Sequence, residues 1–183
     1  MNQGREDFAR VYDDHVWAVY GFLAYRLGNR DVAEDLTQTT FERALRAWSR
    51  FDPRRGSERT WLVTIARNTL IDHVRHAGRT RAEPLDERSL SQVALSDEGP
   101  SQSPELIDAL AQLPEREREL LALRYGGDLT GPEIAKLVGL SLANVQQINS
   151  RALRKLRALL DEGPQAHSAT TAPSAISSNP SAR

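Results

Sequence analysis

Residues 129–156, LTGPEIAKLVGLSLANVQQINSRALRKL, constrain the fold of this chain more than any other segment. Their apolar positions form two helical stripes, the first made of Ile134, Ala135 and Val138 and the second of Val145, Ile148 and Ala152. Gly139 lies between the stripes, where a tight turn needs a residue that tolerates positive φ. Ser141 is suited to cap the second helix. The segment therefore predicts a helix-turn-helix, although an ordinary helical hairpin that binds nothing would share this spacing.

Residues 5–76 contain three further amphipathic helical patterns, and no part of the chain shows the alternation typical of strands. Asp31 and Glu34 have the spacing of a capping box for the second pattern. A loop around Gly56 precedes the third pattern, and Gly78 is positioned to end it. The sequence thus predicts an all-α protein.

The predicted helices fall into two small domains, at residues 5–76 and 103–161. Residues 77–102 lack helical periodicity and contain Gly, Pro and scattered charges, which predicts a flexible linker. Ser103 and Pro104 are suited to open the next helix as its cap and first residue. Residues 162–183 are rich in Ser, Ala, Thr and Pro, and we expect a disordered tail.

Charge is segregated along the chain, although the formal net charge is only −1. Residues 51–81 hold seven arginines and three acids, whereas residues 83–119 hold ten acids and three arginines. A basic segment of this kind favours a nucleic-acid partner. The chain has no cysteine and shows no signal peptide or membrane-spanning run, so a cytoplasmic location is expected.

Two blocks of sequence resemble a known family. Residues 33–45, AEDLTQTTFERAL, followed by residues 59–76, RTWLVTIARNTLIDHVRH, resemble the second conserved region of a bacterial sigma factor. The segments LPEREREL and LRYGGDLTGPEIAKLVGLSLANV, within residues 113–145, resemble the fourth region. The order and the intervening linker match the extracytoplasmic-function (ECF) group of the sigma-70 family. The resemblance implies a protein that binds core RNA polymerase and directs initiation at promoters with −10 and −35 elements.

In this family the second helix of the first module binds a coiled coil on the β′ subunit of core polymerase, and the β subunit is a further expected partner. The resemblance assigns the β′ contact to Asp35, Gln38 and Phe41. Phe41 fits either an aromatic anchor on that surface or an ordinary core position.

The resemblance assigns recognition and melting of the −10 element to the third helix and the loop before it. Melting needs cations that hold phosphates and groups that stack on or hydrogen-bond an unstacked base. The expected residues are Arg54, Arg55, Arg59, Arg67, Asn68, Asp72, Arg75 and His76. Trp61 is a candidate stacking residue, but its register with Ile65 favours a place in the core.

The second helix of the helix-turn-helix is assigned to the −35 element. The residues nearest DNA would be Ser141, Leu142, Ala143, Asn144, Gln146, Gln147, Arg151 and Arg154. Asn and Gln can pair with adenine, and Arg can contact phosphates. The chain departs from the family at Gln146 and Ile148, where Lys and Arg are common. This predicts weaker electrostatic anchoring and more reliance on base contacts.

The linker also predicts how the free protein is arranged. Promoter elements two helical turns apart are separated by roughly 70 Å. A 26-residue linker such as residues 77–102 reaches about 85–90 Å when extended, but averages roughly 30 Å as a free coil. The two modules are therefore expected to lie close together in the free protein, which fits a family whose free members are typically held by an anti-sigma factor.

Other classes of function explain less of the sequence. An enzyme is not expected, because His73 and His76 have no evident third ligand and no other catalytic constellation appears. No metal or cofactor is expected. A stand-alone repressor would leave residues 33–76 unexplained. The main alternative is a sigma-like adaptor that binds polymerase or an anti-sigma factor without initiating, which Gln146 and Ile148 keep open.

Overall fold

The computed structural model describes residues 3–80 and 103–161, and this part of the chain forms helices without strands. The first group of elements is α1 (Gln3–Leu27), α2 (Arg30–Ala47), the 3-10 turn η1 (Trp48–Arg50) and α3 (Glu58–Thr80). The second group is α4 (Pro104–Ala111), α5 (Glu115–Leu121), the π-helical turn η2 (Ala122–Gly126), α6 (Gly131–Val138) and α7 (Leu142–Asp161). The all-α prediction is confirmed. The predicted tail and residues 81–102 of the predicted linker lie outside the described residues.

Two predicted helix ends of the first group were wrong. The N-cap of α2 is Asn29, whose side chain accepts a hydrogen bond from the Val32 amide at 3.0 Å. Glu34 instead accepts a hydrogen bond from Arg30 at 2.8 Å, so Asp31 and Glu34 form no capping box at the helix start. Helix α3 continues through Gly78 to Thr80 and takes the first residues of the predicted linker. A glycine inside a helix costs only about 1 kcal/mol relative to alanine, which favourable neighbours can offset.

The predicted helix-turn-helix is confirmed in its local geometry. Thr130 and Glu133 form a reciprocal capping box at the start of α6. Gly139 ends this helix in the left-handed region, at φ 68° and ψ 34°. The Ser141 hydroxyl then accepts a hydrogen bond from the Asn144 amide at 3.2 Å, which caps α7.

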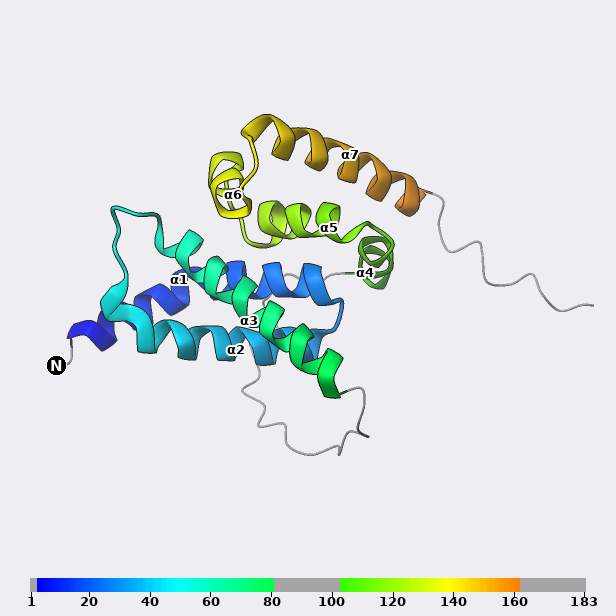
Figure 1. The fold of residues 1–183 in the computed structure, drawn as a ribbon. Coiled ribbons are helices and arrows are strands. Elements are labelled where there is room, and N and C mark those ends of the chain that lie inside the picture. Colours follow the sequence, from blue (N-terminus) through cyan, green and yellow to red (C-terminus); the bar gives the residue numbers. More distant parts are fainter. Residues whose placement is uncertain (1–2, 81–102, 162–183) are drawn as a thin grey trace, which may run out of the picture.

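The two groups of helices pack directly on one another (Figure 1). One hydrophobic core contains Phe22 and Leu23 of α1, Leu62 of α3, Leu123 of η2 and Ile134 of α6. The expected proximity of the two modules in the free protein is therefore confirmed. Within the parts of the chain that the structure describes, no helix is long and apolar enough to cross a membrane.

Candidate nucleic-acid interface

Helix α7 offers one face to the core and leaves the opposite face open. Val145 and Ala152 are fully buried and Ile148 is partly buried, so the predicted apolar stripe holds the helix against the rest of the fold. The side chains predicted to meet the −35 element lie outside this stripe. All of them are exposed: Ser141, Leu142, Ala143, Asn144, Gln146, Gln147, Arg151 and Arg154. An exposed N-terminal half of a second helix is the arrangement that major-groove recognition requires.

The residues predicted for the −10 element are in two different situations. Arg54, Arg55, Asn68, Arg75 and His76 are exposed on α3 and the loop before it. Arg59, Arg67 and Asp72 are less exposed and hold partners within the protein.

Asp72 is bound by a cation of the neighbouring helix. Its carboxylate accepts a hydrogen bond from Arg43 Nη1 at 2.8 Å, and this bond holds the pKa of Asp72 below its ordinary value. The Asp72 carbonyl oxygen also lies 2.8 Å from Nδ1 of His76. Asp72 therefore serves to link α2 to α3 in this conformation.

Arg59 and Arg67 point toward the second group of helices. The Nε atom of Arg67 donates to Glu119 of α5 at 2.8 Å. Arg59 forms an ion pair with Asp128 and also donates to the Asp128 carbonyl oxygen at 3.3 Å. The pairing of these two arginines with acids of the second module is not apparent from the sequence.

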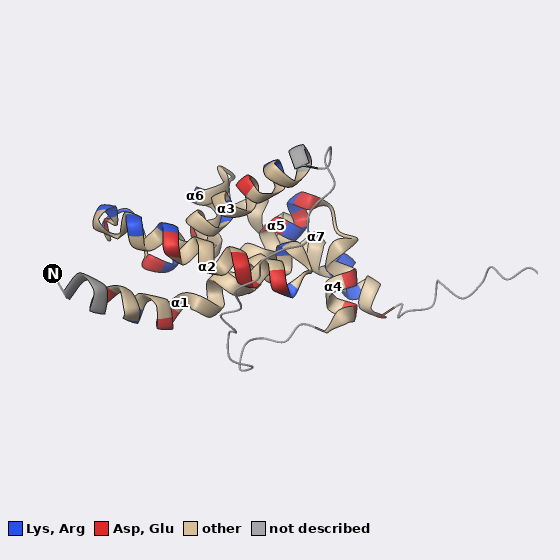
Figure 2. Ribbon diagram, turned by 90° about the horizontal axis from the view of Figure 1, so that it is seen from below, with Lys and Arg blue, Asp and Glu red and all other residues tan. Residues whose placement is uncertain are grey.

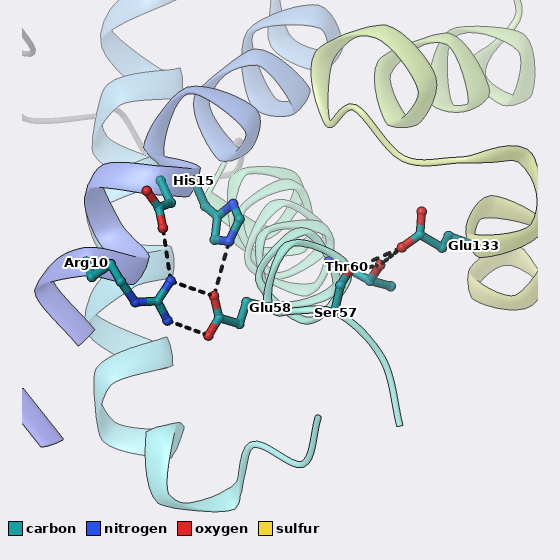
Figure 3. Close-up of polar contacts among 7 residues, drawn as sticks. Arg10, His15, Ser57, Glu58, Thr60 and Glu133 are labelled. Carbon is teal, nitrogen blue, oxygen red and sulfur yellow. Dashed lines mark hydrogen bonds and ion pairs between the residues drawn. The ribbon is translucent and has the colours of Figure 1, made fainter. Parts of the chain in front are cut away.

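Contacts on two sides fix the junction between the loop and α3. At the start of α3, Glu58 accepts hydrogen bonds from Arg10 of α1 at 2.9 Å and lies 3.4 Å from His15 (Figure 3). On the other side, Glu133 of α6 accepts hydrogen bonds from Thr60 at 2.7 Å and from Ser57 at 3.2 Å (Figure 3).

Three aromatic side chains pack together where the same loop begins. Phe51 stacks on Trp48 with ring centroids 5.2 Å apart, and Trp61 packs at a tilt against both rings. Trp61 is partly buried against the hydrophobic core, as its register favoured. It also lines a cavity of about 650 Å³ between the loop and α6, together with Phe51, Thr60 and Lys136.

The predicted polymerase surface on α2 needs one correction. Asp35 and Gln38 are exposed, but Phe41 is only 5% exposed and packs edge-on against Phe8 and Tyr12. Phe41 therefore belongs to the core and is not an anchor on that surface.

The exposed face of α2 instead continues through Glu42 to Leu45, whose side chain is 45% exposed. The spacing of Asp35, Gln38, Glu42 and Leu45 places these residues on one side of a helix. That spacing is the sequence signal that could have pointed to Leu45, which was not among the residues predicted for this surface.

Part of the segregated charge is paired within the described part of the fold. Figure 2 shows Lys and Arg interleaved with Asp and Glu along the helices. Pairs between the modules contribute to this pattern, namely Arg26 with Glu115, Arg59 with Asp128 and Arg67 with Glu119. Part of the basic surface expected to face DNA thus faces acids of the same chain.

Comparison with known proteins identifies both modules. Residues 11–80 match the family description "Sigma-70 region 2", and residues 109–158 match "Sigma-70, region 4". The sigma factor CarQ of Myxococcus xanthus is 35% identical over 166 residues, which cover 88% of this chain and 94% of CarQ. The ECF sigma factor BldN of Streptomyces coelicolor is 34% identical over 163 residues, which cover 85% of this chain but only 61% of BldN.

Solved structures show the same architecture. CnrH, solved in complex with the cytosolic domain of CnrY, is 26% identical, has a TM-score of 0.63, and matches over 87% of this chain and 90% of its own. The sigma factor RpoE, solved with the anti-sigma factor NepR from Bartonella quintana, has a TM-score of 0.66 at 22% identity, over 88% of this chain and 98% of its own, which shows a shared fold. Two family regions in the expected order, together with CarQ matched over 94% of its length and a relative named as an ECF sigma factor, place this chain in the ECF group of the sigma-70 family.

Proposed function

We propose that this chain binds core RNA polymerase and directs initiation at promoters that carry −10 and −35 elements. The observation that carries the proposal is the open face of α7, where every side chain expected to meet the −35 element is exposed while Val145 and Ala152 anchor the helix. The presence of both sigma regions in one chain supports a role that uses the two elements together.

The two modules have different tasks in this function. Residues 5–76 bind polymerase and act on the −10 element, residues 103–161 read the −35 element, and residues 77–102 connect them. Within the first module, the β′ contact uses the α2 face of Asp35, Gln38 and Leu45, all of which are exposed. The exposed Arg54, Arg55, Asn68 and Arg75 supply cations and hydrogen bonds for the −10 strand.

A protein regulator belongs to the same proposal. CnrH, which resembles this chain in fold and sequence, was solved with a partner's cytosolic domain. We propose that an anti-sigma factor in the cytoplasm holds this chain until it is released to polymerase.

The direct test is transcription of fragmented genomic DNA by core polymerase, with and without this protein, followed by mapping of RNA 5′ ends. New 5′ ends that share upstream elements would support the proposal and give the promoter sequence. Binding to polymerase without new 5′ ends would favour the adaptor alternative, for which Gln146 and Ile148 are the relevant departures from the family.

Two substitutions separate a sigma factor from an adaptor. Asn68→Ala and Arg75→Ala remove exposed side chains on α3, a different helix from the one proposed to bind polymerase. A sigma factor carrying them should lose initiation while it still binds polymerase. If initiation were unchanged, Asn68 and Arg75 would have no role in recognition of the −10 element.

A further inference from the structure

A small cavity lies where the C-terminal end of α1 meets α4 and α5 (Figure 1). Its volume is about 20 Å³, which is enough for one group the size of a water molecule. Arg26 of α1 and Arg118 of α5 line the cavity together with apolar side chains such as Ile107 and Leu110 of α4. The described residues that line it include no acid and none of the residues expected to contact DNA or polymerase. The cavity is therefore separate from the surfaces described above.

Both arginines have nitrogen atoms that are hidden from water. Nε and Nη1 of Arg26 and Nε of Arg118 are buried, and none of the three has a hydrogen-bond partner in the part of the chain that the structure describes. The Arg26 side chain is only 13% exposed, and that of Arg118 is 24% exposed. A guanidinium group stays charged in proteins and can only donate hydrogen bonds. Because a buried donor without an acceptor is unfavourable, these three donors make the cavity suited to an acceptor.

The charge beside the cavity is positive. Glu115 of α5 forms an ion pair with Arg26 and accepts a hydrogen bond from Nη2 of Arg118 at 2.7 Å. These bonds lower the pKa of Glu115 to about 2, so this carboxylate is ionised at neutral pH. One carboxylate compensates only one of the two guanidinium charges. An acceptor that carries a negative charge would compensate the other.

We propose that this cavity binds one chloride ion, held by Arg26 of the first module and Arg118 of the second. A water molecule fits the donors less well, since its oxygen accepts two hydrogen bonds and its own hydrogens need acceptors that two cations do not offer. A chloride ion accepts hydrogen bonds from several donors, supplies the compensating charge and is only slightly larger than water. A phosphate or sulfate, with five heavy atoms, exceeds the cavity.

The site is independent of the proposed function, because no group in it is assigned to promoter DNA or to polymerase. Chloride binds to the described fold through side chains from two different modules, so a chain whose modules are apart has no complete site. Transcription assays test the proposed function, and chloride binding tests this site. Failure of either leaves the other standing.

The ³⁵Cl resonance of sodium chloride provides the measurement, because exchange of chloride with a protein site broadens this line. The parent protein should broaden it. Sodium bromide should reverse the broadening, since bromide carries the same charge on a single atom and competes for the same donors. Sodium gluconate at the same ionic strength should not, because gluconate is too large for the cavity. If bromide and gluconate had equal effects, the broadening would come from charges on the surface and the proposal would fail.

Two arginines of α5 give a matched pair of variants. Arg118 donates to Glu115, and Arg116 donates to Glu119 at 3.0 Å, so each binds a glutamate three residues away. Only Arg118 lines the cavity. Arg118→Met should lose most of the bromide-sensitive broadening, whereas Arg116→Met should retain it. Equal broadening in the two variants would overturn the chloride site, and the cavity would then hold water.

A second pair of variants tests the charge without removing a donor, and it decides the matter if circular dichroism shows that Arg118→Met does not fold. Glu115→Gln raises the net positive charge beside the cavity, so chloride should bind about threefold more tightly in a titration of the linewidth. Glu105→Gln makes the same change on α4 at a residue that does not line the cavity, and it should leave the affinity unchanged. If Glu115→Gln bound chloride no more tightly than Glu105→Gln, the cavity would not be an anion site.

Discussion

Phe41 and Leu45 lie one helical turn apart on α2 and have opposite environments. Phe41 is buried against Phe8 and Tyr12, whereas Leu45 is 45% exposed beside Glu42. A bound partner would remove the apolar surface of an exposed leucine from water. An exposed leucine on a face of otherwise polar residues is therefore suited to anchor a protein contact. The two residues should therefore respond to substitution in different assays.

Leu45→Ala should weaken binding to core polymerase and change the free energy of unfolding by less than about 0.5 kcal/mol. Phe41→Ala should instead destabilise the fold by about 3–5 kcal/mol, since it leaves a cavity in the core. Urea unfolding and a binding titration with core polymerase measure the two effects. Equal polymerase affinity of the Leu45→Ala and parent proteins would remove Leu45 from that surface.

Residues on α7 should divide into those that read bases and those that hold phosphates. Gln146→Ala should relax the base preference at one position of the −35 element, with a loss of about 1–3 kcal/mol on the preferred sequence. Arg154→Ala should weaken binding on every sequence and reduce the salt slope by about 1. Binding of mapped promoter DNA by the polymerase complex, over a series of salt concentrations, distinguishes the two. If Gln146→Ala lost the same affinity on every DNA sequence, Gln146 would contact the DNA backbone and not a base.

The turn of the helix-turn-helix depends on one backbone conformation. Gly139 has φ 68°, and a Cβ there would meet no atom within 4 Å, so only backbone strain opposes a side chain. Gly139→Ala should cost roughly 1–2 kcal/mol of unfolding free energy. Gly139→Asn should cost less, because asparagine tolerates this region better. Urea unfolding of the two variants provides the measurement, and an alanine variant no less stable than the asparagine variant would contradict this account.

Local chemistry predicted the helix-turn-helix but misplaced two helix ends of the first module, where Asn29 caps α2 and α3 continues through Gly78. The caps at Thr130 and Ser141 and the turn at Gly139 depend on neighbouring residues, so the helix-turn-helix could be predicted from its sequence. The π-helical turn η2 packs on Gly21, more than 90 residues earlier in the chain, and no local pattern indicates it. The pairing of Arg67 with Glu119 was hidden for the same reason, because it depends on how two modules dock.

Docking of the two modules pairs arginines of the first with acids of the second, namely Arg26 with Glu115, Arg59 with Asp128 and Arg67 with Glu119. The described residues therefore behave as one closed unit, in which arginines expected to face DNA are neutralised within the chain. A closed unit held partly by carboxylates should respond to acid, and Glu115 is the most informative of them. Its pKa is lowered from 4.5 to about 2, chiefly by the hydrogen bond from Arg26 of the first module.

A lowered pKa in the closed form means that Glu115 contributes stability above its ordinary pKa of 4.5, and that this contribution is lost as the pH falls from 4.5 toward about 2. The two modules should therefore separate over this range. Because the chain has no cysteine, dyes attached at Asp13→Cys on α1 and Ala158→Cys on α7, both at exposed positions, would report the separation as a decrease in fluorescence energy transfer. Glu115 is 66% exposed, so the effect should be small and should diminish at high salt.

Glu115→Gln should flatten this part of the pH profile and lower the transfer slightly at neutral pH, because the amide carries no charge for Arg26 to bind. Glu105→Gln is a suitable control, since Glu105 also has a lowered pKa but receives its hydrogen bonds from its own helix start. Circular dichroism at each pH separates opening of the modules from loss of helices. If Glu115→Gln and Glu105→Gln flatten the profile equally, the acid response belongs to the helices of the second module and not to the contact between modules.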